Sequence, residues 1–301
     1  MSITLASANT ATSTGKTLPP ELQKIVARVT EISSLPEITT RIVAVVEDPR
    51  ATARDMHDIV RSDPALVAKI LKVVNSAFYG LPAQIASLER AIVMLGLSAV
   101  KNLALAASLS RMFRADAVCD QFAARDLWRH CVAAGVAARL LANAVHLPQV
   151  DEAFVAGLVH DVGLIVAQQL FPAKLREVAT ACLSNPQDFC ATEIAVIGAD
   201  HQALGWALAS RWKFPPGLRH AIAYHHEPWA LQPELRRMAA TVYVADTLIC
   251  QAKLGFWLTA SRQAVSDETL GLVELSRPAL DEIVAALPGH VDEAEQIFAD
   301  G

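Results

Sequence analysis

The sequence has few cysteines, and they show no metal-site spacing. The five cysteines are odd in number, and no two of them are separated by only two residues. A CxxC spacing is typical of cysteine-ligated zinc, so a zinc site of that kind is not expected. We predict reduced, mostly buried cysteines, as in a cytoplasmic protein.

Excess positive charge and long apolar runs are also absent. The 26 Lys and Arg residues are outnumbered by 31 Asp and Glu residues, which gives a net charge of -5. This balance argues against a general nucleic-acid surface or a surface for anionic membranes. No apolar run is long enough to span a bilayer, and no basic segment followed by an apolar one suggests a secretion signal. We therefore expect a cytoplasmic location, with no nucleic-acid or membrane partner.

The alternating pattern of a half-buried strand does not occur over any useful length, and no fixed-period repeat suggests a solenoid. Apolar residues instead recur at helical spacing almost throughout from Leu18 onward. Hydrophobic residues make up 53% of the chain and charged residues 19%, which fits a folded protein with a sizeable core. The predicted fold class is all-α.

Capping signals place several helix ends. Thr52 to Asp55 resembles a capping box with Asp in place of Glu, and Asp63-Pro64 joins an N-cap to a proline at the first helical position. Gly96 is expected to end a helix. One helix is expected from Glu152 to Leu170, and Pro288-Gly289 is expected to separate the last two helical segments.

Composition divides the chain into three parts. Residues 1–17 are rich in Ser, Thr and Ala and are expected to form a flexible tail. The more polar stretch from Arg114 to Asp120 marks a boundary between helical regions. The predicted division is a tail at 1–17, a first helical subdomain at 18–116 and a second at 117–301, which includes the C-terminal helices.

Two motifs in the first half carry a family resemblance. Asp63-Pro64-Ala65-Leu66 begins a helix, and Asn75-Ser76-Ala77-Phe78-Tyr79-Gly80 lies at its end. At this spacing they resemble the HDOD domain of bacterial signalling proteins, and the resemblance covers about Leu18 to about Ala252. It implies an N-terminal HDOD helical subdomain packed on a C-terminal helical bundle like that of HD-superfamily proteins. Capping and turn chemistry explain the polar residues of both motifs better than ligand contact does.

The second half contains many histidines and a few aspartates in apolar surroundings. His160 and Asp161 are adjacent within the apolar run Ala156 to Gly163, and Asp246 interrupts an apolar helix. A buried acid is costly unless it is paired or bound to a cation. Imidazole and carboxylate donors suit one or two divalent ions such as Fe, Mn, Zn or Ni. The candidate metal ligands are His130, His160, Asp161, His201, His225, His226 and Asp246, with Asp126 one helical turn before His130.

The spacing of the adjacent pair limits how it could bind metal. Neighbouring residues on a helix point about 100° apart. His160 and Asp161 could therefore serve one ion only near a helix end, or two ions with Asp161 as a bridge. The alternative is that the histidines are satisfied by Asp161, Asp246 and backbone carbonyls without a metal. The other four histidines, His57, His146, His220 and His290, are expected to be ordinary core or surface residues.

The order of these residues resembles the metal site of HD-superfamily phosphohydrolases. By that resemblance, the basic mononuclear pattern is filled by His130, His160, Asp161 and Asp246. The positions added in the binuclear HD-GYP branch, which hydrolyses cyclic di-GMP, are filled by His201, His225 and His226, and Asp126 stands where that branch has a Glu.

Two elements depart from the HD-GYP pattern. Leu164 replaces a lysine, and Pro228-Trp229-Ala230 replaces the GYP tripeptide. By the resemblance, the missing elements would hold substrate phosphates and shape the pocket. The HDOD family is generally regarded as a relative that has lost catalysis.

Two functions are consistent with these features. The first is a non-catalytic regulatory module that binds a signalling protein or a small ligand, for example a nucleotide, and retains a metal site that could tie its helices together. The second is a metal-dependent phosphohydrolase acting on a cyclic dinucleotide or a nucleotide. The departures from the HD-GYP pattern favour the first.

Overall fold

Helices make up the regular structure of the protein. The computed structural model describes residues 16–28, 37–76, 79–109, 119 and 122–299. Among these residues there is no strand, only an isolated bridge between Cys119 and Phe122, so the all-α prediction is confirmed. The elements in chain order are α1 (Pro20–Arg28), α3 (Glu37–Glu47), α4 (Ala53–Val60), α5 (Pro64–Val74), α6 (Leu88–Leu95), α7 (Leu97–Leu109), α8 (Ala124–Ala144), α9 (Val150–Val159), α10 (Val162–Leu170), α11 (Pro172–Ser184), α12 (Phe189–Val196), α13 (His201–Arg211), α14 (Pro216–Tyr224), the 3-10 helix η2 (Pro228–Ala230), α15 (Pro233–Gln251), α16 (Asp267–Val273) and α17 (Arg277–Ala299).

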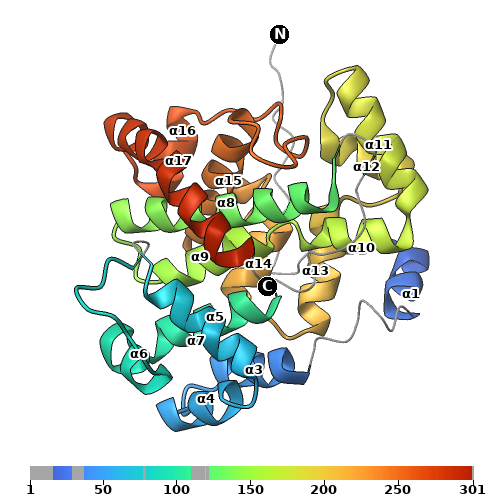
Figure 1. Cartoon of the computed structure of the whole chain (residues 1–301). Helices are drawn as coiled ribbons and strands as arrows, with labels where there is room; N and C mark the ends of the chain where they lie inside the picture. Colours follow the sequence, from blue (N-terminus) through green and yellow to red (C-terminus); the bar gives the residue numbers. More distant parts are fainter. Residues whose placement is uncertain (1–15, 29–36, 77–78, 110–118, 120–121, 300–301) are drawn as a thin grey trace.

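Helices α3 to α6 form a group at one end of the molecule, and α7 joins them to the rest, whereas α1 lies apart from them and packs on α13 (Figure 1). Helix α7 packs on α3, α5 and α6, and it also packs on α9. Nearly every residue of α7 from Ala99 onward is buried. An N-terminal helical group therefore packs directly on the helical bundle that follows, as the HDOD resemblance implied.

The later helices surround α8 and α9. Helix α8 packs on α9, α15 and α17, while α10 packs on α13 and α14 packs on α13 and α15. Small residues let α8 and α9 approach closely, because a Cβ atom on Gly157 would lie 2.6 Å from the carbonyl oxygen of Ala134. This bundle holds the histidine-rich part of the sequence at its centre.

The predicted caps form as expected. Thr52 and Asp55 make a capping box at the start of α4, and the Asp63 side chain accepts the backbone N–H of Leu66 at 3.0 Å at the start of α5. Gly96 ends α6 with a φ of 87°, a conformation that favours glycine. The side chain of Asn75 is bonded to backbone groups at the end of α5 and beyond it, as predicted for a polar turn residue.

Two helix predictions are wrong. The segment from Glu152 to Leu170, expected to be one helix, forms two helices with a turn at His160 and Asp161. The sequence pattern does not reveal this turn, because apolar residues continue at helical spacing on both sides of it. The break expected at Pro288 does not occur, and α17 continues through it. Pro288 and Val284, whose carbonyl would otherwise accept the missing N–H, are both exposed, so water can replace that hydrogen bond.

The expected flexible tail and the expected boundary between subdomains lie mostly outside the described residues. Residues 1–15 of the expected tail and most of the expected boundary at 114–120 lie outside the described residues, and the three-part division stays a prediction. Lys16 makes ion pairs with Asp200 at 3.0 Å and with Glu227 at 2.6 Å. No helix in the described ranges is both long enough and apolar enough to cross a membrane.

Replacing Gly163 with alanine tests the packing of α10 on α13. A Cβ atom there would lie 1.8 Å from the backbone oxygen of His201, so the helices must separate. We expect Gly163→Ala to lower the free energy of unfolding by at least about 3 kcal/mol, the upper range for overpacked cores. Chemical denaturation followed by circular dichroism measures this change.

The matched control is Gly289→Ala in α17. Nothing lies within 4 Å of the added atom, and helical propensity favours alanine, so this variant should be neutral or slightly more stable. Equal stability of the two variants would contradict the assigned close contact.

Candidate metal centre

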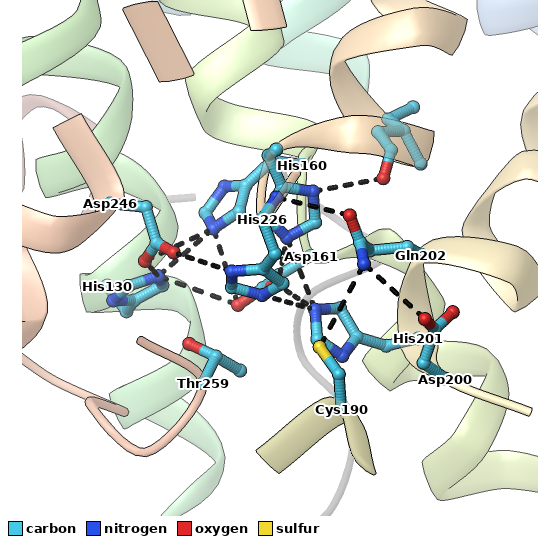
Figure 2. Close-up of polar contacts among 12 residues, drawn as sticks. His130, His160, Asp161, Cys190, Asp200, His201, Gln202, His226, Asp246 and Thr259 are labelled. Carbon is cyan, nitrogen blue, oxygen red and sulfur yellow. Dashed lines mark hydrogen bonds and ion pairs between the residues drawn. The ribbon is translucent and has the colours of Figure 1, made fainter. Parts of the chain in front are cut away.

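Seven of the eight predicted ligands meet in one buried cluster inside the bundle (Figure 2). His130 comes from α8, Asp246 from α15, and His201 is the first residue of α13. The other four members form the pairs His160-Asp161 and His225-His226, which directly follow α9 and α14. All these side chains are 0% exposed except that of His226, which is 6% exposed.

The two pairs use the same local arrangement. His160 and His225 are each the first residue after a helix, and each Nδ1 meets a carbonyl three residues earlier. The distances are 2.7 Å from His160 to the oxygen of Gly157 and 3.0 Å from His225 to that of Ile222. These last-turn carbonyls have no partner within the helix, so the rings cap them. With Nδ1–H donating, each Nε2 keeps its lone pair and points into the cluster.

The inward-facing donor atoms form two groups. In the first group, Nε2 of His130 lies 3.2 Å from Nε2 of His160 and 3.2 Å from Oδ1 of Asp246. Oδ2 of Asp161 lies 3.5 Å from Nε2 of His130 and 3.4 Å from Nε2 of His160. Two imidazoles and two carboxylates therefore converge on one point.

The second group is built around His201. Its Nε2 lies 3.2 Å from Nε2 of His225 and 3.0 Å from Nε2 of His226. The other carboxylate oxygen of Asp161, Oδ1, lies 3.4 Å from Nε2 of His201 and 3.6 Å from Nε2 of His225. Asp161 thus directs one oxygen to each group, which is the bridging geometry that its position beside His160 allowed.

These spacings fit coordinated ions. With metal–nitrogen distances of about 2.0–2.1 Å, neighbouring donors lie about 3.0 Å apart in an octahedron and about 3.4 Å apart in a tetrahedron. The donor separations of 3.0 to 3.6 Å cited above fall in or near that range. Both oxygens of Asp161 and Oδ2 of Asp246 are buried and have no hydrogen-bond partner among the described residues. Buried carboxylates of this kind need balancing positive charge, from protonated histidines or from bound ions, and the set of imidazole and carboxylate donors fits one or two divalent ions.

The carboxylates also control the charge of two histidines. Burial is the largest influence and lowers the pKa of His160, but the carboxylates of Asp161 and Asp246 and the carbonyl of Gly157 together outweigh it and raise this pKa to about 9. Burial likewise opposes charge on His201, but the Glu193 carboxylate and then Asp161 raise its pKa to about 9. The cluster therefore attracts positive charge, and an ion bound at these nitrogens would displace protons.

The pKa values of two other histidines and of both aspartates in the cluster are lowered. Burial lowers the pKa of His225 to about 4 and that of His226 well below its usual value, and nearby histidines add to both shifts. Burial acts to raise the pKa of Asp161 and Asp246, but the surrounding imidazoles hold both well below the usual range. Neutral imidazoles and ionised carboxylates are the forms that bind metal.

Glu193 contacts the cluster but is not among the eight predicted ligands. Its Oε2 accepts the backbone N–H of His201 at 3.0 Å and lies 2.6 Å from Nδ1 of the same residue. This contact orients the His201 ring, in the way that a carboxylate bonded to the outer nitrogen of a metal-bound histidine orients that histidine. Glu193 is fully buried in α12. The signal that identified Asp246, an acid within an apolar helix, was also present here.

Asp126 is the one predicted ligand that the structure does not bring into the cluster. Its side chain accepts the backbone N–H of Ala123 at the start of α8, so it caps the helix that carries His130. An acid in the first helical turn is stabilised there by free N–H groups and by the helix dipole, and this role competes with metal binding. Outside the cluster, as expected, His57 contacts Glu89 at 2.6 Å.

The two departures from the HD-GYP pattern have structural counterparts. Leu164 is fully buried in the core, one helical turn after Asp161. Pro228, Trp229 and Ala230 form η2, where the Trp229 ring packs against Tyr243 at 5.7 Å. Neither element presents a cationic group to the metal centre.

Comparison with known proteins identifies the relatives of this chain. A model of the HDOD domain matches residues 32–228. An uncharacterized protein of Treponema pallidum (strain Nichols) is 27% identical over 229 residues, which cover 75% of this chain and 43% of the relative. The chain thus spans less than half the length of that curated relative.

Crystal structures show the same fold. An HDOD domain protein of unknown function from Geobacter sulfurreducens has a TM-score of 0.76 and 23% identity, covering 92% of this chain and 98% of its own. A protein from Shewanella amazonensis SB2B, provisionally named a phosphohydrolase, has a TM-score of 0.74 and 21% identity, and the match covers 93% of this chain and 98% of that protein. A protein from Marinobacter aquaeolei VT8, provisionally named a signal transduction protein, has a TM-score of 0.73 and 23% identity, covering 93% and 64%. These similarities establish the fold alone.

Metal content tests the division of the donors into two groups. We expect His201→Ala to lose the ion of the second group. Asp161→Ala should weaken the binding of both ions, because the two oxygens of Asp161 serve both groups. Elemental analysis after dialysis against Fe, Mn, Zn or Ni gives the number of ions per chain. Asp126→Asn is the control and should keep the metal content of the unmodified chain. Loss of metal from Asp126→Asn alone would contradict the assignment.

Glu193→Gln tests the orientation of His201. Removing the charge while keeping the shape should weaken metal binding in the second group by about 10–100-fold, the usual effect of altering such a partner. Competition with a chromogenic chelator measures this affinity. The exposed Glu282→Gln in α17 serves as the matched control. An affinity unchanged by Glu193→Gln would show that His201 does not need this partner.

Proposed function

The chain belongs to the HDOD domain family, and on that premise we propose that it is a non-catalytic regulatory module of bacterial signal transduction. In this proposal it acts in the cytoplasm, and its output is the binding of a signalling protein or a small ligand by the N-terminal helices and the cleft between the two helical groups. The observation that carries the proposal is the burial of the metal centre, where even the most exposed ligand side chain, that of His226, is 6% exposed. A phosphate ester could not reach these donors without displacement of the surrounding helices.

The surroundings of the centre support the same conclusion. Hydrolysis of a phosphate ester generally uses cationic groups to hold the phosphate and neutralise its charge. Leu164 is apolar and fully buried, and the segment after Glu227 packs an indole ring against Tyr243. Neither feature supplies a positive charge to a substrate.

The donor set has a structural use in this proposal. Bound ions would neutralise Asp161 and Asp246 and connect α8 and α15 with the ends of α9, α13 and α14. The residues His160 and His225 are already oriented by helix carbonyls, so little reordering is needed for binding. The centre would thus fix the arrangement of the bundle on which the N-terminal helices rest.

A metal-dependent phosphohydrolase is the second candidate, favoured by a specific observation. The donor set is sufficient for two ions, with Asp161 as the bridge between His130, His160 and Asp246 on one side and His201, His225 and His226 on the other. Two bound ions could supply a metal-activated water and an electrophile for the phosphoryl oxygen. Cyclic dinucleotides and nucleotides are the substrate classes to test.

Metal removal and turnover distinguish the two functions. We expect chelation to lower the midpoint of thermal unfolding by at least about 5 °C, since each kcal/mol moves the midpoint by about 2–4 °C in a chain of this size class. We expect no metal-dependent release of product from cyclic di-GMP, cyclic di-AMP or nucleoside triphosphates. Calorimetry and chromatography of the reaction mixtures provide the two measurements.

The control for both measurements is His290→Ala, a histidine variant in α17 away from the centre, which should behave like the unmodified chain. Metal-dependent turnover that His160→Ala abolishes and His290→Ala preserves would establish the phosphohydrolase instead. An unfolding midpoint that chelation does not change would contradict the stabilising role of the metal.

A further inference from the structure

A cavity lies where the first helical group meets the bundle. It has a volume of about 360 Å³, at the small end of the range for ligand sites. Its wall includes Glu47 at the end of α3, Lys101 and Asn102 on α7, and Glu152 in the first turn of α9. We call it the junction cavity. In Figure 1, α3, α7 and α9 follow one another from the edge of the molecule toward its centre.

The amide of Asn102 is available to a ligand or to water in the junction cavity. This residue is 9% exposed, and its side chain has no hydrogen-bond partner among the described residues. Buried amides are nearly always hydrogen-bonded, because an unmet group costs about 1–3 kcal/mol. On α7, its apolar neighbours Val100 and Leu103 are buried, whereas the polar residues Ser98 and Lys101 line the cavity together with Asn102.

The charges around the junction cavity are unpaired in the same way. Within the described part of the chain, the side chains of Lys101, Glu47 and Glu152 make no hydrogen bond or ion pair, and Lys101 acts on the carboxylate of Asp55 only through its charge. Burial raises the pKa of the Glu152 carboxyl, and the nearby charge of Glu47 raises it further. Two carboxylates that repel one another across a cavity are stabilised by a cation placed between them. Glu47 also lies in the last turn of α3, where the helix dipole disfavours an acid.

The carboxylate of Glu152 lies against the start of α14. A Cβ atom on Gly217 would lie 2.3 Å from Oε1 of Glu152, so in the observed side-chain conformation the carboxylate occupies space that Gly217 leaves open. Glu152 therefore belongs to the bundle, whereas Glu47, Lys101 and Asn102 belong to the first helical group. A molecule that contacts both sides would join the two groups.

The residues that line the cavity limit the chemical classes of ligand that fit it. Its apolar part is aliphatic and includes Val46, Leu97 and Pro215, and no aromatic ring lines it among the described residues. Nucleobases are commonly held by stacking on aromatic side chains, which this wall does not offer. With both acids ionised, two carboxylates and one ammonium group leave a net charge of -1, so a complementary ligand carries a net positive charge and one acceptor group.

We propose that the junction cavity binds a small basic zwitterion, of the size and charge of a basic amino acid. Its cationic side group lies between Glu47 and Glu152, and its carboxylate faces Lys101 and the amide of Asn102. This inference rests on the proposed regulatory function and names the class of small ligand that such a module would sense. The ligand would stabilise the contact between the first helical group and the bundle.

Isothermal titration calorimetry on the full chain tests this proposal with L-arginine, L-lysine, agmatine and guanosine. We expect saturable binding of L-arginine or L-lysine and at least a tenfold loss of affinity in Glu152→Gln. Lys101→Met should weaken the binding of L-arginine more than that of agmatine, because agmatine lacks the carboxylate that Lys101 would contact. The exposed Glu177→Gln in α11 is the matched control and should bind like the unmodified chain.

Three outcomes would overturn the proposal. These are no saturable binding of any of the three amines up to millimolar concentration, affinities equal in Glu152→Gln and the control, or binding of guanosine alone. Circular dichroism confirms that each variant is folded before its affinity is interpreted.

Turnover of cyclic di-GMP, measured on the same preparations, separates this proposal from the regulatory function. Absence of amine binding without turnover would reject only the ligand class. Turnover would reject the non-catalytic function, whether or not the amines bind.

Discussion

The constraint on which the centre of this protein depends is the charge of two buried carboxylates, Asp161 and Asp246. Both are 0% exposed, and three of their four oxygens have no hydrogen-bond partner among the described residues. Their negative charge must be balanced by protons on histidine or by bound cations. The same field that raises the pKa of His160 and His201 to about 9 favours divalent ions at those nitrogens. The stability of the five helices packed around these carboxylates therefore depends on balancing the buried charge as well as on burying apolar surface.

The sequence was sufficient to predict the all-α fold, the capped helix starts and the identity of seven clustered residues. Those signals are local: a His-Asp pair in an apolar run, or an acid such as Asp246 inside an apolar helix. The separation of the donors into two groups was not predictable, because it depends on how helices far apart in the chain pack together. Asp161 could be recognised as a possible bridge, but only the positions of His130 and His201 show which oxygen faces which group.

The remaining differences arise where one residue type has two uses. Asp126 looked like a ligand because it lies one turn before His130, but near a helix start a carboxylate also caps free N–H groups, and here it does so. Glu193 is also an acid within an apolar helix, like Asp246, but it contacts His201 and contributes no oxygen to the two donor groups. Pro288 usually interrupts a helix, yet the exposed side of α17 tolerates it. Local patterns list the possible roles of such residues, and tertiary packing decides among them.

The contact between Gly163 and the backbone of His201 has a consequence for motion. Because main chain touches main chain at this point, no side-chain rotation can absorb a relative displacement of α10 and α13. Asp161, directly before α10, and His201, the first residue of α13, therefore move as one unit. Any opening of the centre has to occur elsewhere, by displacement of α8 and α15 or of the corner after α14. The seam between α10 and α13 is the fixed side of the site, and the opposite elements are the ones whose movement would admit a molecule from solvent.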